Sequence, residues 1–127
     1  MEQKAVFFTA LSDTFRLRCL ALINANGEIC VCQLTHALEA PQPKVSKHLA
    51  ILRAAKLIEQ RRAAQWVLYR LAELPNWAEA VLQGALAGVA DEVVHLSDLQ
   101  RLASAPEGPP TRIHQFSTSK EAGSWKQ

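Results

Sequence analysis

The chain is poor in several residues and patterns that mark particular classes of protein. Its 127 residues include only three cysteines, five glycines and 6% aromatic residues. No apolar run approaches the ~18 residues that a membrane-spanning helix needs. The start of the chain also lacks the basic and apolar segments of a signal peptide. We therefore expect a soluble, cytoplasmic protein without a membrane partner. In that reducing compartment, structural disulfides are not expected.

Motifs for catalysis are missing as well. No Ser/His/Asp set, glycine-rich phosphate loop or pair of catalytic carboxylates stands out in the sequence. Cys30 and Cys32 have the spacing Cys-X-Cys rather than the Cys-X-X-Cys of redox enzymes, and no strand–helix redox unit surrounds them. The sequence therefore predicts a protein that is not an enzyme and has no catalytic cofactor. A thiol oxidoreductase is a remote alternative.

The charge, in contrast, is concentrated. The net charge is only +2, but residues 41–70 carry seven lysines and arginines against one acidic residue, Glu59. A basic block inside a folded region is typical of a surface that faces a polyanion such as nucleic acid. An ordinary solvated face is the alternative interpretation.

Apolar periodicity predicts four helices in the first half of the chain. They cover residues 3–11, a stretch capped by Ser12 or Asp13 and stopped at Asn24–Gly27, about 31–38, and a helix that starts at Pro43. The second helix should bury Phe15 and Cys19 and expose Arg16 and Arg18. The fourth should bury Val45 and leave its basic residues outside. Two helices joined by a short break, the second basic on its outer face, indicate a helix-turn-helix.

The second half predicts a hairpin and a long helix. Residues 57–62 and 65–71 read as two strands with a tip near 62–65, which is the wing of a winged helix. A helix from Pro75 to about Ala103 carries a broad apolar stripe and small residues four apart. We interpret it, with the first helix, as a homodimer interface; core packing is the alternative. The fold class is thus mainly α with a small hairpin (α-α-α-α-β-β-α) in one domain over residues 1–103, and 104–127 is expected to be a disordered tail.

At this point the residues resemble a known family. The stretch Gln42–Leu49, followed by Leu52-Arg53 and then Trp66–Leu71, is similar to ArsR/SmtB winged-helix repressors. The stretches Leu11–Leu17 and Glu28–Leu34 resemble those of its arsenical-resistance repressors. The resemblance covers about residues 5–85. It implies a homodimeric, autoregulatory repressor that leaves double-stranded operator DNA when trivalent arsenic or antimony binds as inducer.

The chain departs from this family in three places. Thr35 stands where the arsenical sensors often have a third cysteine, and the wing tip has Ala63-Ala64 where glycine is common. Asp91, His95 and Asp98 lie on the last helix without the spacing of the family's other metal site. The resemblance of Glu28–Leu34 to the metalloid site of the arsenical-resistance repressors implies ligands at Cys30 and Cys32, and no metal site is expected on that helix.

The spacing of these two cysteines constrains how they can act. Trivalent arsenic and antimony prefer thiolates, as Cu(I), Zn and Cd do. Side chains two positions apart point roughly 200° apart on a helix but share one face of an extended segment. The pair can therefore hold one ion only if the start of the third helix is not helical when the ion is bound. If that start is helical on DNA, binding must unwind it and disturb the adjacent recognition helix.

Several questions stay open from the sequence. The third ligand is Cys19, from either subunit, or a water, hydroxide or small thiol; a buried Cys19 that only packs in the core is the alternative. The same pair would also suit a Cd/Zn/Pb-responsive or thiol-redox-responsive repressor. Two incidental core cysteines are the plainest alternative.

The expected DNA surface follows from how a recognition helix enters the major groove, with its N-terminal residues near the base edges. The residues expected there are Gln42, Lys44, Ser46, Lys47 and His48. Arg53, Arg61 and Arg62 are expected on phosphates, the last two from the wing. A structural hydrogen bond is the alternative role for His48.

Overall fold

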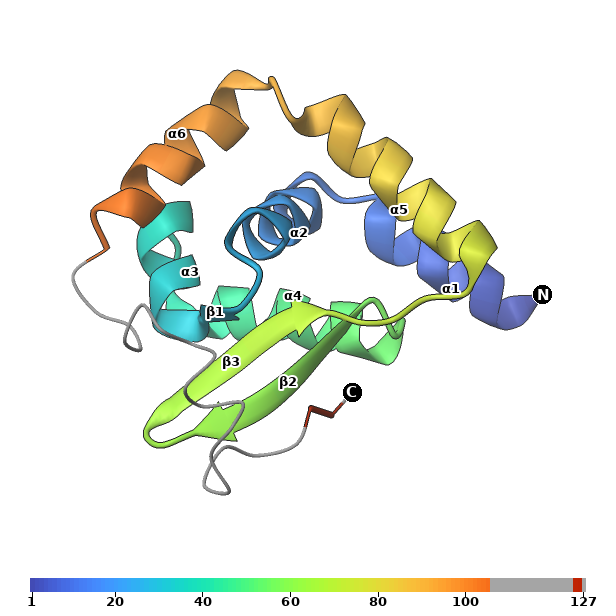
Figure 1. Ribbon diagram of the computed structural model, residues 1–127, viewed down its shortest axis with the longest axis horizontal. Helices are drawn as coiled ribbons and strands as arrows, with labels where there is room; N and C mark the ends of the chain where they lie inside the picture. Colours follow the sequence, from blue (N-terminus) through green and yellow to red (C-terminus); the bar gives the residue numbers. More distant parts are fainter. Residues whose placement is uncertain (106–124, 127) are drawn as a thin grey trace.

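The computed structural model describes residues 1–105 and 125–126 and has the winged helix-turn-helix fold that the sequence predicts (Figure 1). The elements are α1 (Glu2–Leu11), α2 (Thr14–Asn26), β1 (Ile29–Cys30), α3 (Val31–Leu38), α4 (Gln42–Ala54), β2 (Ile58–Ala63), β3 (Trp66–Leu71), α5 (Asn76–Val89) and α6 (Val93–Ala103). No helix in the described ranges is long and apolar enough to cross a membrane.

The helix ends follow local chemistry. Asp13 is the N-cap of α2, and its carboxylate accepts a hydrogen bond from the Arg16 backbone N–H at 2.9 Å. Gly27 ends the same helix with φ = 81°, a backbone conformation that glycine adopts without steric cost. Pro41 is the N-cap of α4, and Pro43 lies in its first turn, where a missing N–H costs nothing.

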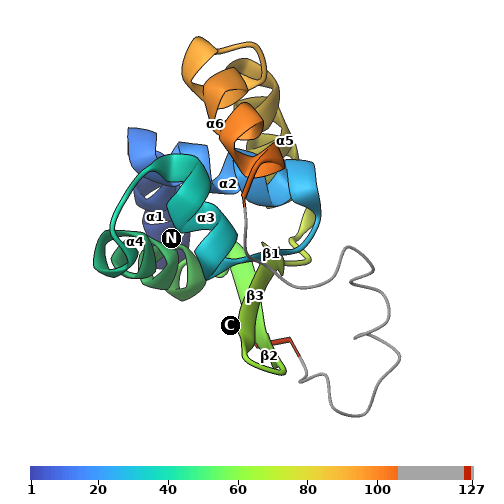
Figure 2. The ribbon, with the colours of Figure 1, turned by 90° about the vertical axis from the view of Figure 1, so that its left-hand side faces the viewer.

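The sheet has one strand more than the sequence predicted. Its order is β1-β3-β2, all antiparallel, with Ile29 opposite Tyr69 and Cys30 opposite Leu68. The two-residue β1 carries too little alternation to be recognised in a sequence. The wing, β2 and β3, extends away from the helices (Figures 1 and 2). Its tip is Ala64, which has φ = 56° where a glycine is common.

The core lies between the helices and the inner face of the sheet. Its fully buried side chains come from the helix-turn-helix, from β1, from the start of β2 and from α5: Leu20, Leu22, Ile23, Ile29, Leu34, Val45, Leu49, Leu52, Leu57, Ile58 and Leu82. The predicted stripe of α4 is therefore confirmed, because Val45, Leu49 and Leu52 have no exposed surface. The outer face of α4 is left free for another partner.

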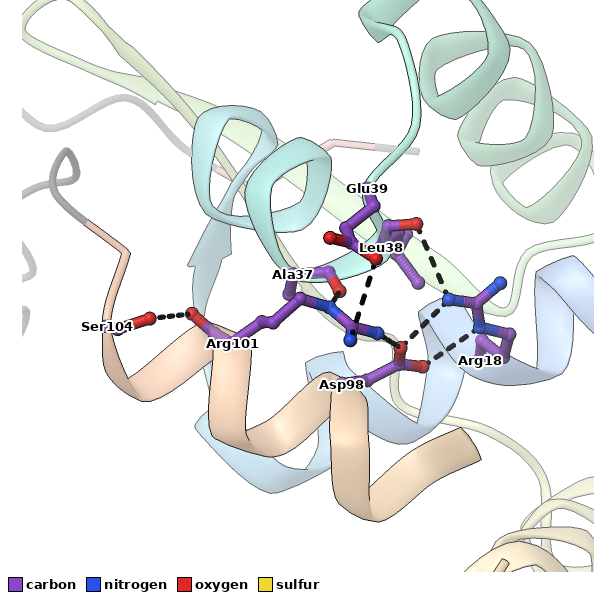
Figure 3. Close-up of polar contacts among 7 residues, drawn as sticks. All are labelled: Arg18, Ala37, Leu38, Glu39, Asp98, Arg101 and Ser104. Atoms are coloured by element: carbon purple, nitrogen blue, oxygen red, sulfur yellow. Dashed lines mark hydrogen bonds and ion pairs between the residues drawn. The ribbon is translucent and has the colours of Figure 1, made fainter. Parts of the chain in front are cut away.

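The predicted long helix over residues 75–103 is wrong in one respect. It is broken after Val89, and α6 starts anew at Val93 with Glu92 as an extended N-cap. The break lets α6 fold back onto α2 and α3. Asp98 is thereby fully buried, and its carboxylate lies 2.8 Å from Arg18 Nη2 and 2.7 Å from Arg101 Nη2 (Figure 3). We call these three residues the Asp98 clamp.

Two arginines predicted to be exposed are instead used inside the fold. Arg16 is buried, and its guanidinium donates to the backbone carbonyls of Ala10 (2.8 Å) and Thr9 (3.1 Å) at the end of α1. Arg18 belongs to the Asp98 clamp. Helical periodicity places both on the polar side of α2, but α1 and α6 cover that side, which periodicity alone does not reveal.

Most of the predicted tail, residues 106–124 and 127, lies outside the described residues. Trp125 and Lys126 are described, and both contact the wing. Lys126 forms an antiparallel bridge with Gln60 of β2. No pattern in the sequence predicts this contact.

Candidate nucleic-acid interface and cysteine site

The N-terminal half of α4 presents a polar, basic surface. Gln42, Lys44, Ser46 and Lys47 are all exposed, outside the buried stripe of the helix. The ammonium of Lys44 lies 4.5 Å from the centre of the Phe15 ring. These four side chains can reach a partner without any rearrangement of the core.

His48 is placed differently from its neighbours. Its side chain is only 15% exposed and its ring packs on Phe15, with 4.9 Å between ring centres. Its Nδ1 lies 3.1 Å from Arg16 Nη1 and 3.9 Å from an Asp13 carboxylate oxygen. Burial lowers the pKa of His48, which the Asp13 carboxylate only partly opposes. This placement suits the alternative role, a hydrogen-bonding residue that joins α4 to the start of α2.

A groove separates the start of α4 from the wing. It is lined by Val31, Gln42, Ser46, Gln60, Arg61, Arg62, Val67, Tyr69 and Lys126. Arg62 is exposed there and can meet a phosphate. Arg53 is half-buried, next to the Gln60 amide: in the amide orientation that satisfies its neighbours, the amide oxygen accepts from the Arg53 guanidinium at 3.1 and 3.3 Å.

Arg61 does not share the exposure of Arg62. It is 4% exposed, and its Nη2 lies 3.3 Å from a carboxylate oxygen of Glu28. Its guanidinium carbon also lies 4.8 Å from the centre of the Trp125 ring. Successive residues of a strand point to opposite faces, so Arg61 and Arg62 occupy opposite sides of the wing.

The structure brings Cys30 and Cys32 together. Cys30 ends β1 and is the N-cap of α3 in an extended conformation (φ −89°, ψ 158°), while Cys32 lies in the first turn of the helix. Their Cα atoms are 5.4 Å apart and their sulfurs are joined as a disulfide. Sulfurs that can bond to each other can also face a single ion.

The disulfide differs from the expectation that structural disulfides do not form in this protein. The condition that the helical period sets for the pair is met without any unwinding of α3. Cys30 lies just outside the helix in an extended conformation, and α3 begins at Val31. Only two cysteines that both lie within the helix would point apart.

Cys30 is also a structural part of α3. Its sulfur accepts a hydrogen bond from the Gln33 backbone N–H at 3.4 Å, and its own N–H donates to Gln33 Oε1 at 3.0 Å. This reciprocal pair is a capping box with sulfur in place of the usual hydroxyl. The helix N-terminus also stabilises a thiolate. Arg61 pairs with the Glu28 carboxylate, which would otherwise oppose that effect.

Cys19 is not brought to this pair. It is a free thiol, fully buried on α2 among the residues of the main core. Cys30 instead packs with Ala63 and Leu68 on the other side of the sheet. Burial raises the pKa of Cys19 to about 12, which keeps the thiol protonated. The described residues contain no group of three or more Cys, His, Asp or Glu side chains arranged to hold a metal.

Comparison with known proteins gives a consistent result. Residues 15–60 match the family described as "Bacterial regulatory protein, arsR family". The chain is 45% identical to the "Arsenic resistance transcriptional regulator ArsR1" of Pseudomonas putida, over 85% of this chain and 84% of that protein. It is 43% identical to the "Arsenical resistance operon repressor" of Escherichia coli, over 61% of this chain and 68% of that one.

Solved structures of related folds agree. "HlyU from Vibrio cholerae N16961" superposes with a TM-score of 0.62 at 28% identity, covering 71% of this chain and 95% of that one. Among the relatives found by sequence, a "Transcriptional repressor SmtB homolog" of Synechocystis is 42% identical over 57% of this chain and 54% of its own length. The chain belongs to the arsR family of bacterial regulatory proteins, which are helix-turn-helix transcriptional regulators and not enzymes.

Proposed function

We propose that this protein is a cytoplasmic, homodimeric transcriptional repressor that releases its operator when trivalent arsenic or antimony binds Cys30 and Cys32. The observation that carries the proposal is the meeting of the two sulfurs at the N-cap of α3. That helix packs directly against α4, the recognition helix. The names of the Pseudomonas putida and Escherichia coli relatives, which are arsenic and arsenical resistance regulators, support the choice of ligand.

The chemistry needs only the reduced pair. Arsenite, As(OH)3, condenses with two thiols: two As–S bonds form, two As–O bonds break, and each thiol proton leaves with a hydroxide as water. One hydroxide remains on arsenic. Water, hydroxide or a small thiol serves as the third ligand, and we assign Cys19 to core packing.

Binding would act on DNA through the cap of α3. In the reduced pair, a Cys30 thiolate that bonds to arsenic becomes a poorer acceptor for the Gln33 N–H than the free thiolate; the Cys30 sulfur caps this N–H in the structure. Loss of an N-cap costs about 1 kcal/mol, and the first turn of α3 adjoins α4. A ligand that binds the uncapped arrangement better shifts the population away from the DNA-binding one. No unwinding of the whole helix is required.

The DNA-facing residues divide into two groups. Gln42, Lys44, Ser46 and Lys47 would read base edges and adjacent phosphates in the major groove. Arg62 and Arg53 would hold phosphates beside the groove. His48 would position α4 through Arg16 rather than contact DNA.

The dimer would form through α1 and α5. Val6, Phe8 and Trp77 are exposed there despite their size, at 48%, 50% and 39%. Gly84 and Gly88 lie on α5 with open space where a side chain would be, which allows a second helix to approach closely. Two-fold symmetry then predicts an inverted-repeat operator with half-sites about 34–36 Å, one helical turn, apart.

The test compares release of operator DNA by arsenite, antimonite, Cd, Zn and peroxide. Cys30→Ser with Cys32→Ser should bind operator normally and ignore arsenite, while Cys19→Ser, the matched control, should respond like the wild type. Release of the double variant by arsenite at the wild-type concentration would refute the cysteine site.

A second candidate, a thiol-redox response, is favoured by the disulfide itself. Two thiols would give two electrons and two protons to peroxide, forming the disulfide and two waters. In the same titration, release by peroxide without release by arsenite would select this function. Release by Cd or Zn alone would select a divalent-metal sensor, to which the SmtB-like relative points.

A further inference from the structure

The outer face of the sheet, away from the helices, carries a small apolar cluster of its own. Cys30, Ala63 and Leu68 have no exposed surface there, although this face has no helix over it among the described elements. Cys32, Trp66 and Trp125 pack against them. We call these six residues the outer-face cluster.

Trp125 is the member that comes from farthest away in the chain. Its indole contacts two cations, with the guanidinium carbons of Arg61 and Arg70 at 4.8 and 4.4 Å from the ring. Both arginines point to the outer face, as the strand register requires: Arg61 is opposite Leu68, and Arg70 is opposite Glu59. Cation–π contacts of this kind stabilise the ring at this position.

The backbone fixes the neighbouring residue. Gln60 N–H donates to the Lys126 carbonyl at 2.5 Å, and Lys126 N–H donates to the Gln60 carbonyl at 2.6 Å. Gln60 thus uses both its backbone groups on the open edge of β2. Lys126 is thus joined to this edge by a single antiparallel bridge, and pairing with a sheet edge is a recurrent way for a peptide segment to bind.

We propose that the wing and its outer face form the docking site for the chain's own Trp125–Lys126 segment, and that docking shields the Cys30–Cys32 pair from reagents. Trp125 covers the apolar cluster that contains Cys30. A ligand can therefore reach the two cysteines only by passing the docked indole or after the segment has dissociated from the wing. A regulatory role for this shielding rests on the proposed function of Cys30 and Cys32. The shielding itself does not depend on that function.

Docking also divides the wing's cations. The guanidinium groups of Arg61 and Arg70 contact Trp125 on the outer face, while Lys126 lines the groove beside α4 together with Arg62 and part of Arg61. Docking therefore keeps two arginines away from phosphates and places one lysine near them. This explains why only Arg62 of the two expected wing-tip contacts is exposed.

The test measures alkylation of the reduced, full-length protein by iodoacetamide, with each cysteine followed separately by peptide mass spectrometry. Trp125→Ala should speed modification of Cys30 and Cys32 roughly tenfold, since it removes two cation–π contacts from the closed form. Trp125→Phe keeps a ring on the two guanidinium groups and should stay close to wild type. Cys19 serves as an internal control because it lies in the main core.

Two results would overturn the proposal. In the first, Trp125→Ala leaves the rates at Cys30 and Cys32 unchanged. In the second, all three cysteines accelerate together, which reports general loosening rather than removal of a shield. Iodoacetamide needs neither metalloid nor DNA, so failure here is separate from failure of arsenite to release the operator.

Discussion

Two buried charges in this protein are held in contrasting ways. Asp98 is enclosed by Arg18 and Arg101, which donate three hydrogen bonds of 2.7–2.9 Å to its carboxylate. Arg61 has a longer ion pair to Glu28, a cation–π contact with Trp125, and an Nε atom that has no hydrogen-bond partner among the described residues. The first arrangement is closed and satisfied, and the second is incomplete. We infer that the Asp98 clamp fixes the helical body, whereas the outer face of the sheet can open.

The largest effect should follow from Asp98→Ala. It leaves two arginines facing a buried space, and breaking a buried ion pair in this way costs ~3 kcal/mol. Urea denaturation followed by circular dichroism measures this loss. Glu39→Ala is the control. The Glu39 carboxylate also pairs with Arg101, at 3.6 Å, but the Glu39 side chain is 70% exposed. A similar loss of unfolding free energy in both variants would mean that the buried ion pairs of Asp98 stabilise the fold no more than the exposed pair of Glu39.

A smaller and more local effect is expected from Glu28→Ala. Removing the partner of the buried Arg61 should cost about 1 kcal/mol and raise hydrogen exchange in β2 and β3 more than in α2. Glu59→Ala, which breaks the more exposed pair with Arg70 at 3.0 Å, is the matched control. Equal exchange changes in the helices and the strands would remove the distinction between the two regions.

The two faces of the wing should differ in DNA binding. Arg62→Ala should weaken operator binding by about tenfold and lower the slope of log affinity against log salt by about 1. Arg61→Ala should change that slope less, because Arg61 is engaged by Glu28 and Trp125. Electrophoretic mobility shifts at several salt concentrations give both numbers. The opposite ranking would place Arg61 on the DNA.

The smallest expected effect concerns pH. Burial lowers the pKa of His48 in the folded protein, so the protonated ring is disfavoured there relative to the unfolded chain. Stability is fully present above the unfolded value of about 6.5 and declines as pH falls through the lower folded pKa. His48→Gln should flatten this decline in thermal melts between pH 7 and pH 5. An unchanged slope would show that His48 does not carry it.

Patterns within single elements were readable from the sequence, and contacts between distant elements were not. The stripe of Val45, Leu49 and Leu52 follows from helical periodicity, and the cap at Asp13 follows from local hydrogen bonding. The arsenical-repressor resemblance led to the family. The break before Val93 goes with the burial of Asp98 against α2 and α3. This is a contact between distant elements, which a local sequence pattern does not reveal.

The candidate site divides in the same way. The pairing of Cys30 with Cys32 could be proposed from their spacing, but whether α3 begins before or after Cys30 decides the geometry, and helix boundaries are poorly defined by sequence. The burial of Arg61 depends on Trp125, 64 positions later in the sequence. No periodicity links the two residues.

The bridge between Gln60 and Lys126 has a further consequence for how the protein behaves at high concentration. An open strand edge is a template on which another chain can add, leading to aggregation. Here one edge strand, β1, is only two residues long and so offers few free backbone groups, and Lys126 pairs with part of the other edge, β2. The end of the chain thus also acts as a safeguard for colloidal solubility.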